Sequence, residues 1–156
     1  MADSQPIARV LVVCLGNICR SPMGEAVLRF MAKERGIAIE VDSCGTAGYH
    51  NGEDPDDRTI ATCEKHSIPI SHSSRKLKNS DFVQFTHILA SDESNLRDIK
   101  RVAPSNGTAE IRLWGSYVDG KAIPDPWYGG MSGFEQVYQQ CTALSKAFLD
   151  QLVGDE

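Results

Sequence analysis

A cysteine and an arginine six positions apart follow the first apolar run of this chain. Residues 9–13 read R-V-L-V-V, the pattern of a buried strand, and lead directly into Cys14, with Arg20 six positions on. Pro22 then stands where a first helical residue is expected, ahead of apolar residues at helical spacing. We therefore expect a strand, a tight loop and a helix N-terminus in succession.

Such a loop favours the binding of a phosphate group and nucleophilic attack on it. Inward-facing backbone N–H groups and the unpaired donors of a first helical turn bind an oxyanion, and the Arg20 guanidinium can contact two of its oxygens. The same positive field favours the thiolate of Cys14, which is the nucleophilic form. Gly and Asn tolerate the unusual dihedral angles of such a loop. The candidate phosphate-binding residues are Leu15, Gly16, Asn17, Ile18, Cys19, Arg20 and Ser21.

The cysteine–arginine spacing is moderate evidence when taken alone. The other four cysteines are followed six positions later by Glu, His, Pro or Ala, so only Cys14 has the arginine. The alternative is a buried structural cysteine beside a surface arginine. The strand expected before the loop and the helix expected after it favour the anion site.

Length and composition predict one domain over residues 1–156, with residues 1–8 as a flexible N-terminal tail. The net charge of −5 and the lack of a long basic run argue against nucleic acid or an anionic membrane as partner. No apolar stretch is long enough for a signal segment or a membrane span. We expect a soluble cytoplasmic protein, monomeric with at most weak self-association.

The cysteine count points to a reducing compartment. Five cysteines without regular spacing do not suit a disulfide framework. No C-x-x-C pair or grouped His/Cys set indicates a metal, and we expect no cofactor.

Apolar runs alternate with helical patterns along the chain. Strands are expected over 9–13, 37–43, 86–91 and 109–114, and helices from Pro22 and over 56–66, 93–101 and 134–153. This alternation predicts an α/β fold with a parallel sheet covered by helices on both faces, and ligands bound outside the carboxyl ends of the strands. Cys14 is at such an end.

A thiolate that attacks a phosphate ester expels an oxyanion, which needs a proton from a general acid. Asp125 is the best candidate, because the prolines on either side stiffen its loop and aromatic residues follow it. The alternative is a proline-rich turn in which this carboxylate only accepts backbone hydrogen bonds. Composition does not decide between the two.

Five segments of the chain resemble the low-molecular-weight protein tyrosine phosphatase family. They are C-L-G-N-I-C-R-S-P from Cys14, residues 41–45, D-E-S-N-L from Asp92, D-P-W-Y-G from Asp125 and F-E-Q-V-Y-Q-Q-C from Phe134. The resemblance spans nearly the whole chain and implies a four-stranded parallel sheet in a three-layer, flavodoxin-like fold. It implies that Asp125 is the general acid and that phosphotyrosine-containing proteins are hydrolysed through a phosphocysteine, without metal. Inorganic phosphate and other oxyanions are then expected inhibitors.

The resemblance also implies supporting roles. Ser21 is expected to donate to the Cys14 sulfur, and Cys19 to form a reversible disulfide with Cys14 under oxidation. The side chains expected to hold Asn17 are Ser43, His72 and Glu25, and those expected to line the mouth of the cleft are Tyr49, His50, Trp127 and Tyr128. Trp127 stands where the family often has tyrosine, which leaves Tyr128 as the candidate of this pair for regulatory phosphorylation.

Other functions of related chains are weighed against this expectation. Arsenate reductases of the same fold need two further redox cysteines in the middle of the chain, and residues 87–92 contain none. Protein arginine phosphatases typically carry threonine in place of Ile18, whose apolar side chain suits a phenyl ring, so arginine phosphatase is the second candidate. A third is a phosphate-binding module without turnover. The nucleotide P-loop is excluded because the chain lacks G-x4-G-K-[ST].

Overall fold

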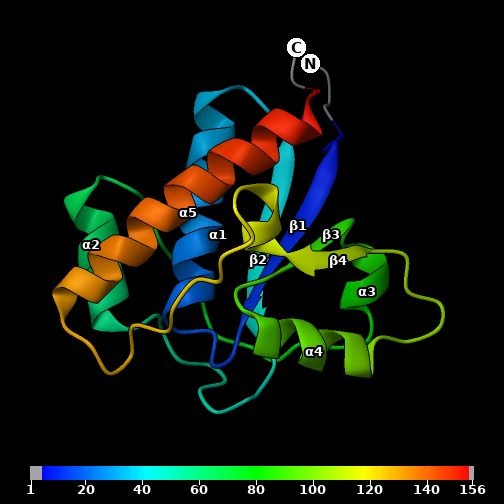
Figure 1. Ribbon diagram of the computed structural model, residues 1–156, viewed down its shortest axis with the longest axis horizontal. Coiled ribbons are helices and arrows are strands. Elements are labelled where there is room, and N and C mark those ends of the chain that lie inside the picture. Colours follow the sequence, from blue (N-terminus) through cyan, green and yellow to red (C-terminus); the bar gives the residue numbers. More distant parts are fainter. Residues whose placement is uncertain (1–4, 155–156) are drawn as a thin grey trace.

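The computed structural model describes residues 5–154 and is built around β1 (Ala8–Cys14), an almost wholly buried strand. β1 lies in a four-stranded parallel sheet of order β2-β1-β3-β4. The other strands are β2 (Ile39–Gly45), β3 (His87–Ala90) and β4 (Glu110–Leu113). Because all four strands are parallel, their carboxyl ends meet at one edge of the sheet (Figure 1).

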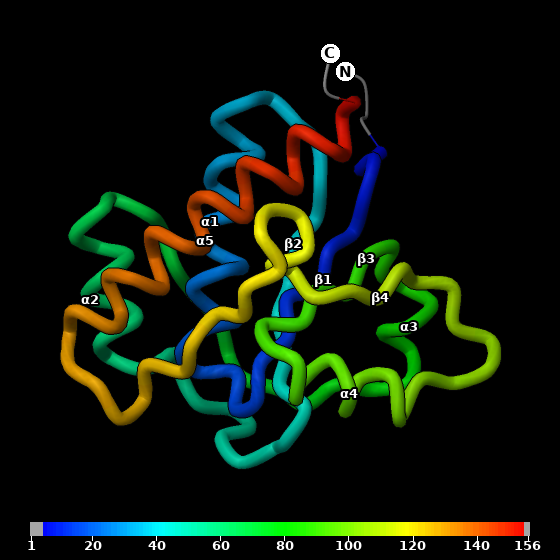
Figure 2. The backbone as a smooth tube through the Cα atoms, viewed as in Figure 1, coloured from blue at the N-terminus to red at the C-terminus, as the bar shows by residue number. Residues whose placement is uncertain are grey.

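Helices cover both faces of the sheet, as expected. One face carries α1 (Arg20–Glu34), α2 (Asp57–Lys65) and α5 (Met131–Leu152), and the other carries α3 (Asp81–Gln84) and α4 (Glu93–Val102) (Figures 1 and 2). The alternation of β1 produces two apolar clusters. Val10 and Val12 pack with α1 and α5, whereas Leu11 and Val13 pack with Phe82 and Ile99 from the opposite layer.

Several boundaries differ from the sequence prediction. The flexible tail predicted over 1–8 was too long, because Ala8 belongs to β1 and the Ile7 N–H donates to the Ala38 carbonyl; residues 1–4 lie outside the described residues. α1 begins at Arg20 rather than at Pro22, since Cys19 already has helical backbone angles. The short α3 and the 3-10 helix η1 (Trp114–Tyr117) were not predicted, because neither contains a full amphipathic period.

No helix within residues 5–154 is both long enough and apolar enough to cross a lipid bilayer.

Candidate active site

The loop between β1 and α1 lines an open cavity. Its carbonyl groups are used outside the loop: those of Cys14 and Leu15 accept the N–H groups of Thr46 and Ala47 at 2.9 and 3.0 Å. No side chain caps the N-terminus of α1, whereas α2 and α4 are capped by Asp56 and Asp92. The first-turn donors of α1 are therefore left for an anion.

Gly45 allows the two loops to approach this closely. β1 pairs with β2 so that Cys14 lies opposite Gly45. A Cβ atom at this position would lie 2.6 Å from the Leu15 carbonyl oxygen and 2.9 Å from that of Ala47. Any larger residue would push the phosphate loop away from β2.

The Cys14 sulfur is almost completely buried and has two donors. Ser21 Oγ lies 3.0 Å from Sγ, and the Asn17 N–H donates to Sγ at 3.3 Å. Ser21 Oγ itself accepts a hydrogen bond from Asn17 Nδ2 at 2.7 Å, and its own proton has two acceptors in reach, the Cys14 sulfur at 3.0 Å and the Cys44 carbonyl oxygen at 3.4 Å. The Ser21 and Asn17 contacts hold the sulfur at the end of β1.

The Arg20 guanidinium is held from behind. Nη1 donates to Asp92 Oδ2 at 2.7 Å and to the Ile123 carbonyl at 3.1 Å, while Nη2 lies 3.8 Å from Asp125 Oδ2. Burial works to lower the pKa of Arg20, but the Cys14 sulfur and the Asp92 hydrogen bond raise it overall. The side chain is thus a fixed cation, with its remaining N–H groups available to phosphate oxygens.

Asp125 is oriented by its own loop. Oδ1 accepts the Trp127 N–H at 3.0 Å, which leaves Oδ2 as the oxygen nearer to Arg20. The carboxyl side chain is 46 % exposed, so both substrate and water can reach it. One carboxylate oxygen of Asp125 thus accepts a backbone hydrogen bond in the turn, while the other remains accessible from the cavity. The structural interpretation and the general-acid interpretation of this residue are therefore compatible.

One cavity of about 280 Å³ joins these groups. It is lined by the loop from Cys14 to Arg20 together with Asp125 and all four residues expected at the mouth: Tyr49, His50, Trp127 and Tyr128. Tyr49 and Tyr128 are strongly exposed, and the His50 and Trp127 rings lie 6.0 Å apart. The cavity has a polar, cationic floor and an aromatic rim.

Comparison with known proteins identifies the family. The model of the low molecular weight phosphotyrosine protein phosphatase family matches residues 9–156. The chain belongs to this family. A phosphatase so named from Schizosaccharomyces pombe is 45 % identical over 150 residues, covering 92 % of this chain and 96 % of its own; one from Homo sapiens is 46 % identical over 153 residues, covering 94 % and 97 %.

Solved structures of phosphatases share the fold. A protein tyrosine phosphatase from Entamoeba histolytica, crystallised with Hepes in its active site, has a TM-score of 0.89 at 30 % identity and covers 94 % of this chain and 97 % of its own. The drosophila arginine phosphatase DARP has a TM-score of 0.89 at 34 % identity and covers 94 % and 99 %. This phosphatase therefore has neighbours of both kinds.

The strained residue of the phosphate loop is held by the side chains predicted to support it. Asn17 has a φ of 61°, in the left-handed region. Its Nδ2 donates to Ser43 Oγ at 3.0 Å, while its Oδ1 accepts the Arg75 N–H at 3.0 Å and lies 2.8 Å from His72 Nε2. These contacts offset the cost of the left-handed conformation and fix the loop.

Both ring nitrogens of His72 have polar partners. Nε2 faces Asn17 Oδ1. This atom is the amide oxygen of Asn17, because it accepts a hydrogen bond from the Arg75 N–H. Nδ1 faces carboxylates, with Glu25 Oε1 at 3.1 Å and Asp42 Oδ1 at 3.7 Å. Glu25, Asp42 and His72 bring their ligand atoms within 4.8 Å of one another, and each ring nitrogen of His72 already has a protein partner. We interpret this cluster as a hydrogen-bonded support for Asn17.

Glu25 makes this network sensitive to acid. Burial works to raise its pKa, but hydrogen bonds from His72 and Ser43 lower the pKa below its ordinary value of 4.5. A group with a lowered folded-state pKa stabilises the fold above the unfolded-state pKa, and this contribution is lost as pH falls through the folded-state value. We expect Glu25→Gln to destabilise the protein at pH 7 and to differ less from wild type below pH 4.5.

Urea unfolding midpoints at pH 7 and at a series of values below 4.5 check this expectation. Glu34→Gln, at the exposed end of the same helix, is the matched control and should follow wild type throughout. A difference between Glu25→Gln and wild type that stays constant with pH would contradict the assignment.

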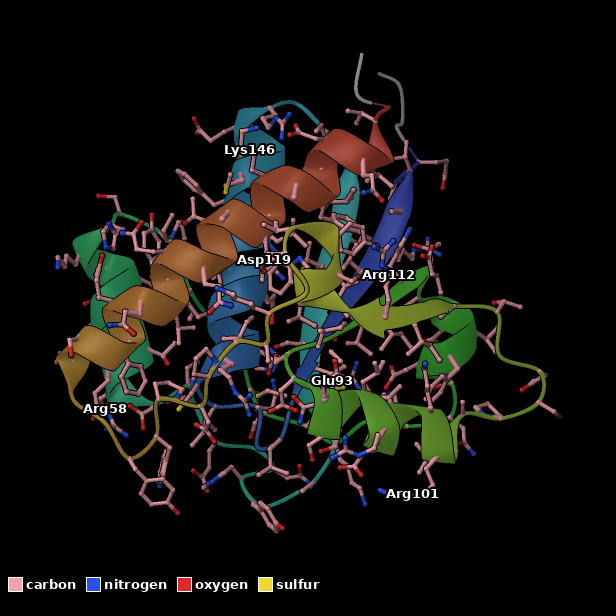
Figure 3. All side chains as sticks on the ribbon, in the orientation of Figure 1. Arg58, Glu93, Arg101, Arg112, Asp119 and Lys146 are labelled. Carbon is pink, nitrogen blue, oxygen red and sulfur yellow. The ribbon has the colours of Figure 1, made fainter. Side chains whose placement is uncertain are left out.

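Sequence reasoning missed two positioning residues. Asp92, which holds Arg20, follows β3 at the same sheet edge as Cys14, and its position after a strand next to β1 could have marked it. Arg58 lies where α2 faces the loop leading into α5 (Figure 3). It donates to the Trp127 and Gly129 carbonyls at 3.1 and 3.2 Å, and nothing in the local sequence connects it with a loop about 70 positions away.

Arg58 is itself anchored, which makes it a clamp on the loop that carries Asp125. Its guanidinium makes a two-point contact with Asp56 and stands 4.5 Å from the centre of the Phe134 ring. We expect Arg58→Lys to lower kcat for an aryl phosphate about tenfold, because a lysine lacks the planar fork that spans all these contacts.

Amide hydrogen exchange at Trp127 and Gly129 should quicken in the same variant, which separates loss of the clamp from a defect in chemistry. Arg97→Lys, an exposed substitution on α4, should change neither measurement. Unchanged exchange in Arg58→Lys would show that the loop is rigid without the clamp.

Of the other four cysteines, all within the described residues, only Cys19 lines the cavity that Cys14 lines. Burial and the nearby Asp56 raise the pKa of the Cys19 thiol to about 12. Cys63 and Cys141 are buried in α2 and α5, and all five cysteines are free. Cys19 borders the same cavity as Cys14, which its proposed redox role requires.

Proposed function

We propose that the protein hydrolyses phosphotyrosine in proteins, with Cys14 as nucleophile, Arg20 as phosphate clamp and Asp125 as general acid. The observation that carries the proposal is the convergence of these three side chains on one cavity with an aromatic rim. The family membership reported above supports the same activity.

In the first step the Cys14 thiolate attacks phosphorus in line with the ester oxygen. The S–P bond forms as the P–O bond to the tyrosine breaks, and Asp125 transfers its proton to the departing phenolate oxygen. Arg20 and the loop N–H groups hold the three other oxygens, where negative charge accumulates. The products are a phosphocysteine and the dephosphorylated tyrosine side chain of the substrate protein.

In the second step water hydrolyses the phosphocysteine. Asp125, now ionised, takes a proton from the attacking water, the S–P bond breaks and phosphate leaves with Cys14 again a thiolate. The Ser21 hydroxyl, 3.0 Å from the sulfur, donates to it as its charge returns and so assists its departure. No step calls for a metal ion.

Arginine phosphatase is the second candidate, favoured by the likeness to DARP. A phosphoarginine side chain is long and carries its phosphoryl group on a polar guanidine nitrogen, whereas phosphotyrosine is flat and aromatic. Ile18, buried at the wall of the cavity, and the aromatic rim offer apolar contacts to a ring. These contacts favour phosphotyrosine.

The test compares phosphate release from matched phosphotyrosine, phosphoserine and phosphoarginine peptides without added metal. We expect phosphotyrosine to be preferred. Preference for phosphoarginine would support the second candidate and overturn the argument from Ile18, and binding without turnover would indicate a recognition module.

The proposal extends to the setting in which the enzyme works. Inorganic phosphate and similar oxyanions compete for the same donors and should inhibit it. Five free cysteines suit a reducing compartment, so we place the enzyme in the cytoplasm, acting as a monomer with at most weak self-association. We further propose that oxidation joins Cys14 to Cys19 reversibly, and that Tyr128, strongly exposed, is the tyrosine open to phosphorylation.

A further inference from the structure

A second cavity lies against the phosphate cavity and shares two wall residues with it. It has a volume of about 350 Å³, and Leu15 and Tyr49 line both. Their side chains are 40 % and 72 % exposed, so they stand as a ridge between the two. A ligand that fills the first cavity therefore has its neighbouring groups beside the second.

The far wall of this second cavity is rigid. The Gly45 N–H donates to the Arg75 carbonyl at 2.9 Å and the Leu77 N–H donates to the Gly45 carbonyl at 2.8 Å, so Lys76 is paired to the end of β2 like a strand residue. The opposite wall comes from α4, which contributes Asp98 and Arg101, the latter labelled in Figure 3.

The residues that line this cavity carry a net positive charge, and one of the cations is unpaired among the described residues. Arg101 and Asp98 form an ion pair with each other. Lys76, the remaining charged residue of the lining, has no ion-pair partner within residues 5–154. A lysine without an ion-pair partner at the wall of an open cavity fits a carboxylate, to which its ammonium can donate.

We propose that this cavity is a subsite for an acidic side chain that flanks phosphotyrosine in the protein substrate. The proposal rests on the function proposed above, since it places the phosphotyrosine in the first cavity. An extended peptide advances about 3.3 Å per residue and alternates its side chains, so a Glu or Asp within about three positions of the phosphotyrosine can cross the ridge and reach Lys76. Because the protein as a whole is acidic, it does not attract acidic peptides through its net charge. Lys76 is therefore the local group that would favour a substrate with an acidic side chain.

The test uses phosphotyrosine peptides with Glu or Gln at each position from −3 to +3. The measured quantity is the Glu-to-Gln ratio of kcat/KM within one enzyme variant, which cancels changes in the chemical step. We expect wild type to favour Glu about threefold at one position at low salt, the magnitude of an exposed ion pair, and less at high salt. Lys76→Gln should bring that ratio to one, and Lys76→Glu should invert it.

Lys78→Glu is the matched control, because this lysine is also exposed on the same segment but does not line the cavity. It should retain the wild-type ratio. A wild-type ratio of one at every position, or an equal loss in Lys78→Glu, would overturn the subsite.

Turnover of a small aryl phosphate by wild type separates this proposal from the function itself. If wild type hydrolyses the aryl phosphate but its Glu-to-Gln ratio is one at every position, the result supports the proposed function and contradicts the subsite. Without turnover, the same Glu-to-Gln ratio is measured on peptide dissociation constants, and a preference for Glu lost in Lys76→Gln still supports the subsite.

Discussion

Cys14→Ser lowers kcat by roughly 10⁴-fold or more and leaves phosphate binding intact. A serine hydroxyl is a weak nucleophile without an adjacent base, and no histidine within residues 5–154 is hydrogen-bonded to Cys14 to act as one. The groups that bind the anion, Arg20 and the loop N–H groups, are unchanged by the substitution. Phosphate release measures the loss, and calorimetric titration with inorganic phosphate measures the retained affinity.

The matched control for this prediction is Cys63→Ala. It removes a buried thiol in α2, which lowers stability but leaves the cleft untouched, so turnover per folded molecule should persist. Comparable turnover in Cys14→Ser and wild type would mean that another group attacks phosphorus. Loss of both turnover and phosphate binding would mean that the sulfur helps to form the site itself.

Asp125→Asn slows poor leaving groups far more than good ones. An amide cannot donate a proton as a carboxylic acid does, so hydrolysis of phenyl phosphate should fall by about 10²–10⁴-fold. A nitrophenolate leaves without protonation, so its ester should lose much less. The measurement is the dependence of kcat/KM on the leaving-group pKa across a series of aryl phosphates, which should steepen in the variant.

Asp119→Asn tests whether the effect is specific to Asp125. Asp119 lies in the same connection between η1 and α5, is exposed and accepts the Lys121 N–H, so the substitution keeps a similar local role without facing the cavity. Asp119→Asn should leave the dependence of kcat/KM on the leaving-group pKa unchanged. Equal slowing of all esters in Asp125→Asn would assign this residue to loop structure and not to proton transfer.

Much of the fold was predictable because the apolar periodicity was strong. The parallel order of strands, the loop from Cys14 and its exit into a helix follow from local pattern and from the chirality rules of α/β folds. The short elements α3 and η1 were missed because neither contains a full amphipathic period. α3 is also held by residues distant in the sequence, since the Thr108 and Ala109 N–H groups both donate to the Phe82 carbonyl.

The site was predictable in part for a related reason. Cys14 and Arg20 belong to one loop, so their spacing carried the information. Asp125 stood beside an equally acceptable structural interpretation until the family resemblance was considered. The contacts of Asp92 and Arg58 join segments about 70 positions apart, and only the folded chain brings them together.

Each strand end supplies a separate part of the active site. The proposed nucleophile is the last residue of β1, the wall with Tyr49 and His50 follows β2, Asp92 follows β3, and the proposed acid follows β4 and η1. Because the wall after β2 does not contain the nucleophile, the cation or the acid, it is exchangeable. If residues 46–53 are replaced by the corresponding residues of a relative, we expect the chimeric protein to acquire the substrate preference of that relative. The chemical step should remain that of the parent protein.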